Sequence, residues 1–141
     1  MGVVNMTIKT IRDFDTDVLK VLYEDAGWAS YLKNDTAFKD MFTKSLDVLG
    51  AYENDELIGL VRVVGDDNHI VYIQDILVLK NHQRQGVGNA LINTILNRYS
   101  HVRQIVLMTD ATDAAACKFY QNNGFKTMQE ANIVGYVKLK S

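Results

Sequence analysis

A short glycine-containing loop between an apolar, strand-like run and a helix-like run constrains the fold of this chain most strongly. The apolar run covers residues 70–79, and the loop that follows it reads Gln83-Arg84-Gln85-Gly86-Val87-Gly88. The two glycines let the backbone approach a ligand closely, and the first N–H groups of a helix point outward with the positive end of the helix dipole. The pattern therefore predicts a strand–loop–helix unit that can bind an anion, with diphosphate as the natural ligand.

Apolar periodicity and turn residues predict the other elements. The expected strands cover residues 7–11, 48–52, 57–64, 70–79, 104–109, 125–128 and 134–139. Four helices are expected. The first begins at about Asp15 or Thr16, the second follows a cap at Asp35 or Thr36, the third covers residues 87–99 and the fourth covers residues 113–123. Short polar turns predict that the strands between residues 48 and 79 are antiparallel neighbours. The long helical connection to residues 104–109 predicts a right-handed parallel crossover.

Length, charge and cysteine content limit the class of protein. A chain of 141 residues can bury one hydrophobic core, so we expect a single domain over residues 1–141. Its formal charge of −2 at pH 7 gives no basic surface for nucleic acid or an anionic membrane, whereas a cationic partner would be tolerated. The single cysteine fits a reducing cytosol, and no window approaches the length of a membrane span. We therefore expect a cytoplasmic protein with no nucleic-acid or membrane partner.

Three segments, in the same order and spacing, resemble the GNAT N-acetyltransferase superfamily. Gln83, Gly86 and Gly88 match its acetyl-CoA loop, Gln/Arg-x-x-Gly-x-Gly/Ala. Upstream, Asp75-Ile76-Leu77-Val78 is similar to its central strand. Downstream, the chain reads Asp113-x-x-Ala116-x-x-x-Tyr120-x-x-x-Gly124-Phe125, where the family usually has asparagine in place of the aspartate. The resemblance is clear over the C-terminal half and is nearest to the plant serotonin-type and bacterial small-amine members.

This resemblance implies both the fold class and the cofactor. The fold class is α/β (α+β mixed): a GNAT-like central mixed, mostly antiparallel sheet, splayed in the middle and flanked by helices on both faces. The implied acyl-donor cosubstrate is acetyl-CoA, whose pantetheine arm would pair with the central strand. The implied cofactor-binding residues are Ile76, Leu77, Val78, Gln83, Arg84, Gln85, Gly86, Val87, Gly88, Asn89, Asp113 and Tyr120. The family commonly has a proline after its central strand, whereas this chain has Lys80-Asn81 and no proline, which predicts a less rigid approach to Gln83.

Two residues are candidates for the catalytic groups. Tyr120 aligns with the tyrosine that stabilises the leaving thiolate in the family, and the alternative is a ring that only packs in its helix. The catalytic glutamate of the histone-modifying branch would fall at Tyr72, which cannot accept a proton in the same way. Asp75 is the nearest carboxylate on the strand that could accept the amine proton. A structural role for Asp75, as an acceptor for turn or backbone N–H groups, is an equal alternative. A water relay without a dedicated residue is a third possibility.

The remaining polar and sulfur side chains have simpler interpretations. Asp113 can cap the last helix, and as a cofactor contact it would be weaker than asparagine because its charge repels phosphate. Cys117 is expected to pack as a small hydrophobic residue. Three histidines fall at element ends without metal-ligand spacing, namely His69, His82 and His101. No metal site is predicted.

The sequence thus predicts an acetyl-CoA-dependent N-acetyltransferase that acts on a primary amine by direct attack on the thioester. The acceptor, a small molecule or a peptide, would be recognised by residues in the variable region before residue 60. Trp28 and Tyr31 lie where the family builds its acceptor pocket, although they could equally be core residues or contacts of a homodimer. A non-catalytic acetyl-CoA sensor or subunit is the competing class, and the intact Tyr120 favours the enzyme. A dinucleotide-binding loop is disfavoured because Leu91 occupies its third glycine position.

Overall fold

The computed structural model describes residues 6–140. The chain divides between Met108 and Thr109 into two compact units. Among the described residues, the first unit contains the β-sheet with three α-helices, and the second contains a single α-helix. None of the helices in residues 6–140 has the length and apolar character of a membrane span.

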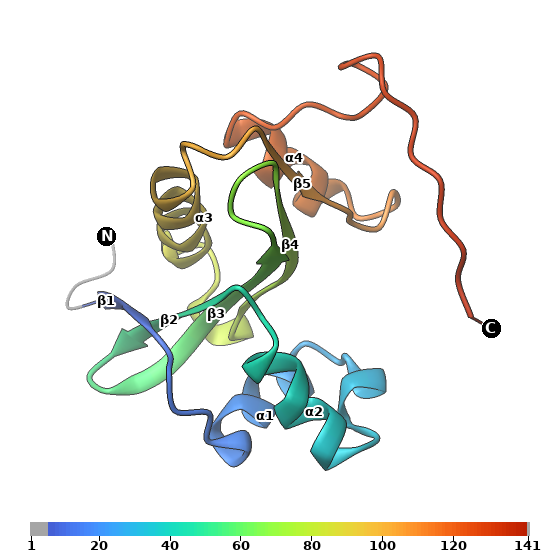
Figure 1. Ribbon diagram of the computed structural model, residues 1–141. Coiled ribbons are helices and arrows are strands. Elements are labelled where there is room, and N and C mark those ends of the chain that lie inside the picture. The colour runs from blue at the N-terminus through green and yellow to red at the C-terminus, as the bar shows by residue number, and fades with distance from the viewer. Residues whose placement is uncertain (1–5, 141) are drawn as a thin grey trace. The chain divides into compact units, whose positions relative to one another are not determined.

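A mixed five-stranded sheet forms the centre of the first unit (Figure 1). Its strands lie in the order β1 (Met6–Thr10), β2 (Asp47–Glu53), β3 (Glu56–Gly65), β4 (Ile70–Val78) and β5 (Gln104–Leu107). Neighbours from β1 to β4 are antiparallel, and β5 pairs with β4 in parallel. The connection from β4 to β5 contains helix α3 (Val87–Arg98). This topology confirms the predicted antiparallel strands and the parallel crossover.

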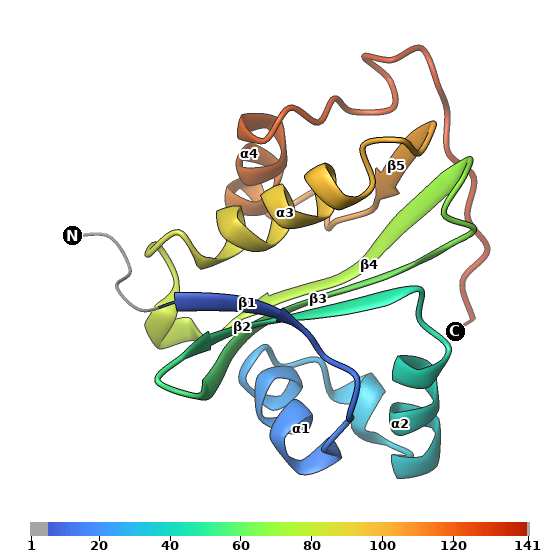
Figure 2. The same ribbon diagram turned by 60° about the vertical axis from the view of Figure 1, so that its left-hand side comes forward.

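Helices cover both faces of this sheet, as Figure 2 shows. One face carries α1 (Thr16–Asp25) and α2 (Asp35–Thr43), and the opposite face carries α3. The apolar stripe of each helix is buried, and the side chains exposed by 2% or less include Leu19, Leu22, Tyr23, Phe38, Phe42, Val87, Leu91, Ile92 and Ile95. Because helices cover both faces, most of β3 is buried regardless of which face a side chain points to. The predicted fold class is therefore confirmed.

Polar side chains fix where the first two helices begin. Asp15 Oδ1 accepts from the N–H of Asp17 at 3.1 Å, which confirms the predicted start of α1. Helix α2 is capped by Asn34, whose Oδ1 accepts from the N–H of Ala37 at 3.0 Å, so the predicted cap at Asp35 or Thr36 was wrong. The structure also contains two short 3₁₀ helices, η1 (Ala29–Leu32) and η2 (Lys80–His82). The sequence does not predict them, because a single turn is too short to show a periodic pattern of apolar residues.

The second unit contains helix α4 (Ala114–Asn122) and, among its described residues, no strand. The expected strands at residues 125–128 and 134–139 are therefore wrong. In the later segment Val134, Tyr136 and Leu139 are exposed by 69%, 92% and 84%. An apolar pattern makes a strand only where a neighbouring strand can take up its backbone hydrogen bonds, and this unit supplies none.

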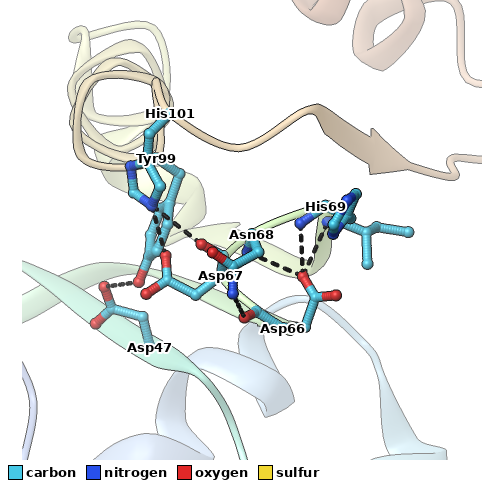
Figure 3. A network of polar contacts seen from close by, with 8 residues as sticks. Asp47, Asp66, Asp67, Asn68, His69, Tyr99 and His101 are labelled. Atoms are coloured by element: carbon cyan, nitrogen blue, oxygen red, sulfur yellow. Dashed lines mark hydrogen bonds and ion pairs between the residues drawn. The ribbon is translucent and has the colours of Figure 1, made fainter.

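A polar network fixes the C-terminal end of α3 (Figure 3). Tyr99 Oη donates to Asp47 Oδ2 at 2.6 Å, and Arg98 Nη1 donates to the same oxygen at 2.8 Å. His101 Nε2 lies 2.9 Å from Asp67 Oδ1 in the turn between β3 and β4. These contacts tie the end of α3 to the start of β2 and to that turn.

The turn between β3 and β4 is itself organised by one carboxylate, also drawn in Figure 3. Asp66 Oδ1 accepts from the N–H groups of Asn68, His69 and Ile70 at 2.9, 2.8 and 3.1 Å. These backbone donors lower the pKa of Asp66 to about 2. The adjacent Asp67 has a left-handed φ of 66°, a conformation that aspartate tolerates better than most residues.

Candidate active site

The loop before α3 has the backbone geometry of an anion-binding turn. Gly86 is the N-cap of α3 with a left-handed φ of 86°, and Arg84 has a φ of 65°. No side chain caps α3, whereas Asp15, Asn34 and Asp113 cap the other three α-helices of the described chain. The N-terminus of α3 therefore lacks the oxygen acceptor that the other helices have, and a phosphate oxygen can take that place.

A glycine on β3 brings this helix end onto the sheet. A Cβ atom at Gly59 would lie 2.9 Å from Val87 Cγ1 and 3.1 Å from the carbonyl oxygen of Leu77. Val87 is the first residue of α3 and is 1% exposed. Since Gly59 lies opposite Val78 in the β3–β4 pairing, the N-terminus of α3 packs close to the end of β4.

The sheet splays along β4. Strand β5 pairs with β4 only from Ile70 to Ile73, whereas β4 continues to Val78. Within the described first unit, residues 75–78 pair with β3 on one side and with no strand on the other, and Gln74 lies at a register shift in the β3–β4 pairing. The predicted splayed sheet is present, and it leaves an open edge beside the end of β4.

In the β3–β4 pairing, hydrogen-bonded and non-hydrogen-bonded residue pairs alternate, and this alternation determines which backbone groups of β4 face the open edge. The N–H of Leu79 donates to the carbonyl oxygen of Ile58 at 2.9 Å. In an antiparallel pair, alternate residues direct both backbone groups at the partner, so those of Leu77 face β3. The N–H and C=O groups of Ile76 and Val78 then face the open edge. Of the three strand residues predicted to bind the cofactor, these two have the suitable backbone direction.

The side chain of Gln83 contacts the strand end. Its Nε2 donates to the carbonyl oxygen of Val78 at 3.1 Å, so this predicted cofactor residue holds the loop against β4. Three other predicted residues are exposed around the same end of α3, namely Arg84, Gln85 and Asn89. The structure therefore brings the predicted residues of β4 and of the loop together at one end of α3.

Asp75 lies in a buried cluster. Its carboxylate is 1% exposed, and its Oδ2 accepts from Arg62 Nε at 2.7 Å and from Tyr23 Oη at 2.8 Å. Its Oδ1 accepts from Tyr31 Oη at 2.6 Å. Arg62 is 6% exposed, so this ion pair places two buried charges beside each other. These contacts favour the structural alternative for Asp75, with side-chain donors in place of the expected backbone ones.

Tyr31 connects this buried cluster with the surface. Its half-buried ring packs against Tyr23 and Trp28, with centroids 5.1 and 6.0 Å apart. Its hydroxyl donates to Asp75 and accepts from the exposed Gln74 Nε2 at 3.1 Å. Burial raises the pKa of the Tyr31 hydroxyl, which keeps its proton available for Asp75. The contact joins residues 44 positions apart, so periodicity and local motifs give no signal for it.

In the second unit, Asp113 and Tyr120 belong to the same helix. Asp113 caps α4 as predicted, since its Oδ1 accepts from the N–H of Ala116 at 3.0 Å. The half-buried ring of Tyr120 packs against Phe119 and Phe125, with centroids 5.1 and 5.9 Å apart. Burial, and secondarily the charge of Asp113, raise the pKa of Tyr120 to about 12. The hydroxyl is therefore protonated at neutral pH and can donate a hydrogen bond.

Among residues 6–140, the other reactive side chains make isolated contacts. Cys117 is half-buried, with its Sγ 3.9 Å from the carbonyl oxygen of Asp110. His82 is half-buried, with its Nε2 3.3 Å from Glu53 Oε1. Within residues 6–140, no three histidine, cysteine, aspartate or glutamate side chains gather as metal ligands would.

The model of the acetyltransferase (GNAT) domain family matches residues 13–140. The chain belongs to the GNAT acetyltransferase family. The match includes β4, the loop before α3 and helix α4, which are the three segments that carry the sequence resemblance. Members of this family use acetyl-CoA as the acyl donor.

Curated relatives of this GNAT domain are acetyltransferases. It is 31% identical over 128 residues to the histone acetyltransferase TAP1 of Glycine max, which covers 84% of this chain and 54% of that protein. It is 29% identical over 76 residues to streptothricin acetyltransferase A of Bacillus subtilis (strain 168), which covers 52% of this chain and 44% of that protein. The chain spans about half the length of these curated relatives.

Solved structures share the fold of this GNAT domain. A GNAT-family acetyltransferase from Streptococcus pneumoniae TIGR4 is 29% identical with a TM-score of 0.83, over 96% of this chain and 98% of that one. A GNAT-family acetyltransferase from Elizabethkingia anophelis is 18% identical with a TM-score of 0.70, over 89% of this chain and 84% of that one. The latter structure has acetyl-CoA bound.

Proposed function

We propose that this GNAT domain is an acetyl-CoA-dependent N-acetyltransferase that transfers the acetyl group to a primary amine by direct attack on the thioester. The observation that carries the proposal is the uncapped N-terminus of α3, which follows the open edge of β4 in a chain of this family. The N-terminus of the helix suits a diphosphate, and the open strand edge suits an extended arm that contains amides.

The residues around this edge divide the binding of acetyl-CoA between them. The N–H groups at the start of α3, reached through Gly86 and Gly88, would hold the diphosphate, and Arg84 adds a positive charge there. The backbone groups of Ile76 and the N–H of Val78 would hydrogen-bond the pantetheine amides as a neighbouring strand does, while the Val78 carbonyl oxygen accepts from Gln83. This arrangement orients the thioester relative to β4, which is the main requirement for a direct attack.

The acceptor must lose a proton before it attacks. An amine of pKa about 10 is neutral only about one time in a thousand at pH 7. Because the contacts of Asp75 disfavour direct proton abstraction, we assign the proton to water and give Asp75 the role of holding Tyr31. The Tyr31 hydroxyl donates to Asp75 and accepts from the exposed Gln74 Nε2, so the acceptor or that water would replace Gln74 as the donor to the Tyr31 oxygen.

The leaving thiolate requires a hydrogen-bond donor, and Tyr120 is the residue proposed for it. Complete proton transfer from a phenol of pKa about 12 to a thiolate of pKa about 8.5 is uphill by about 5 kcal/mol. Tyr120 would therefore stabilise the thiolate by donating a hydrogen bond without giving up its proton. Asp113 would influence Tyr120 only through its charge, since its carboxylate is used in capping α4.

The acceptor is proposed as a primary amine of the small-amine type. The names of the two curated relatives refer to different acceptors: one names a histone, and the other names streptothricin. The half-exposed aromatic pair Trp28 and Tyr31 offers apolar contact area for the carbon skeleton of such an amine. Release of free CoA across a panel of small amines and lysine peptides would identify the class.

Tyr120→Phe tests the enzymatic proposal. The variant should lower kcat by about 10²–10⁴-fold with the Kd of acetyl-CoA within about twofold, because it removes a hydrogen bond needed mainly in the transition state. Tyr136→Phe is the matched control, since Tyr136 is 92% exposed. Undiminished turnover in Tyr120→Phe would refute the donor role.

A non-catalytic acetyl-CoA sensor or subunit is the second candidate. The observation that favours it is that both oxygens of Asp75, the predicted proton acceptor, already accept hydrogen bonds, from Arg62, Tyr23 and Tyr31. A sensor would bind acetyl-CoA and gain thermal stability from it, yet release no CoA with any amine of the panel.

A further inference from the structure

We propose that Asp25, at the end of α1, is a positioning residue for the acetyl-CoA loop. This inference rests on the proposed function of that loop. Asp25 Oδ2 accepts from the backbone N–H of Lys80 at 2.8 Å. Lys80 is the first residue of η2, the short helix between the end of β4 and Gln83.

The position of Asp25 within α1 is unfavourable for the helix itself. The carbonyl end of a helix carries partial negative charge, so acidic side chains in its last turn are destabilising. The last turn of α1 contains Glu24 and Asp25 and no basic residue. The carboxylate of Asp25 therefore does not stabilise α1, and it accepts a hydrogen bond from the Lys80 N–H of the loop segment.

Other contacts of this segment lead to the sheet. Leu79 donates its N–H to Ile58, the Gln83 side chain contacts Val78, and the His82 ring contacts Glu53. Asp25 adds a contact to α1, the helix that also supplies Tyr23 to the Asp75 cluster. A hydrogen bond at Lys80 therefore joins the start of the loop to the helix that helps to form the Asp75–Tyr31 cluster.

The absence of proline makes this contact possible. A proline has no backbone N–H, whereas Lys80 provides one two residues after the end of β4. The sequence predicts a less rigid approach to Gln83 on this ground. The structure shows that hydrogen bonds from Lys80 and Gln83 restrain the same segment.

The consequence concerns affinity. When only a fraction of the free protein holds the loop in its binding conformation, the apparent Kd rises by the inverse of that fraction. Asp25→Ala removes the acceptor for Lys80 and should weaken acetyl-CoA binding about three- to tenfold, with kcat at saturating acetyl-CoA little changed. Its thermal stability should change little, because the better fit of alanine at the helix end offsets the loss of the exposed hydrogen bond to Lys80.

Two matched variants separate the hydrogen bond from the charge. Asp25→Asn loses the charge and keeps an oxygen acceptor, so its Kd should stay within about twofold of the wild type. Glu24→Ala removes the neighbouring exposed carboxylate, and its Kd should not rise. A purely electrostatic effect would have the opposite sign, since loss of a negative charge favours an anionic ligand.

Titration calorimetry with acetyl-CoA and hydrogen exchange of the Lys80 amide form the decisive experiment. We expect faster exchange at Lys80 in ligand-free Asp25→Ala than in the wild type, Asp25→Asn or Glu24→Ala. A wild type that binds acetyl-CoA with an unchanged Kd in Asp25→Ala would overturn this inference alone. A wild type that does not bind acetyl-CoA would overturn the proposed function, and this inference with it.

Discussion

The two ends of α3 are built in opposite ways. At its C-terminal end, Arg98 and Tyr99 both contact Asp47, and His101 contacts the β3–β4 turn. At its N-terminal end, Gly86 supplies no side-chain cap, and the loop before it is exposed. One helix therefore has a terminus whose side chains are held by contacts within the protein and a terminus that a ligand can complete.

This difference separates stability from binding along a single element. The packing of Val87 over Gly59 fixes the position of the uncapped end, and the Asp47 contacts fix the other end. Preorganisation of the ligand-binding terminus then depends on apolar packing rather than on a cap that would compete with the ligand. We expect substitutions at the two ends to affect affinity and stability separately.

The largest expected effect is on acetyl-CoA affinity at the open end. Gly86→Val places a β-branched residue at a φ of 86°, a conformation that valine strongly disfavours, so the loop must change its path. The Kd of acetyl-CoA, measured by titration calorimetry, should rise by about 100-fold or more. The ligand-free fold should be kept, because nothing lies within 4 Å of a Cβ atom at this position.

Gly27→Val provides the matched control for this substitution. Gly27 follows α1 with a φ of 76°, and a Cβ atom there likewise meets nothing within 4 Å. The same backbone strain at this position should raise the Kd by no more than about tenfold, because Gly27 is outside the loop and reaches it only through the neighbouring Asp25. Equal affinity in Gly86→Val and the wild type would remove the loop from the cofactor site.

At the other end of α3, Tyr99→Phe should affect stability alone. It removes the 2.6 Å hydrogen bond to Asp47 from a residue that is 6% exposed. We expect the free energy of unfolding to fall by about 1–3 kcal/mol, with the acetyl-CoA Kd unchanged. Urea unfolding and calorimetry measure the two quantities. A raised Kd in a stable Tyr99→Phe protein would show that the two ends of α3 are not independent.

The pH dependence of this variant adds a second test. Burial, followed by the hydrogen bond to Asp47, raises the pKa of Tyr99. The folded protein thus favours the neutral phenol, so the stabilisation is complete below the ordinary tyrosine pKa of about 10 and is lost as pH rises above it. The stability difference between wild type and Tyr99→Phe should therefore shrink in alkaline solution.

The open end of α3 could be predicted from the sequence because its determinants are local. Gly86 and Gly88 follow an apolar strand and open an amphipathic helix within a few residues, and each feature has a distinct pattern. The antiparallel order of β2, β3 and β4 follows in the same way from short polar turns. The sequence pattern predicts the structure where the residues that contact each other are close in sequence.

Long-range contacts set the limit of prediction. The donors to Asp75 come from Arg62, Tyr23 and Tyr31, which are 13, 52 and 44 positions away. No local pattern distinguishes a carboxylate engaged by such distant side chains from one that is free to accept a proton. The strands expected at residues 125–128 and 134–139 failed for a related reason, because a strand exists only with its partner.

The smallest expected effect concerns the turn to which the closed end of α3 is attached. Asp66 is exposed, and the backbone donors Asn68, Ile70 and His69 lower its pKa to about 2. A carboxylate whose pKa is depressed by folding stabilises the folded state above its ordinary pKa of about 4, and that contribution is lost as pH falls toward 2. Asp66→Asn keeps an oxygen acceptor for the turn and cannot titrate.

The stability difference between wild type and Asp66→Asn should therefore be constant above about pH 5 and should decrease between about pH 4 and 2. Urea unfolding at a series of pH values measures it, and carbon chemical shifts of the Asp66 carboxyl give the midpoint directly. The acetyl-CoA Kd at neutral pH should be the same in both proteins, because the turn lies with the closed end of α3. A carboxyl midpoint near 4, or a stability difference that does not change between pH 5 and 2, would show that the three N–H donors do not hold Asp66 in solution.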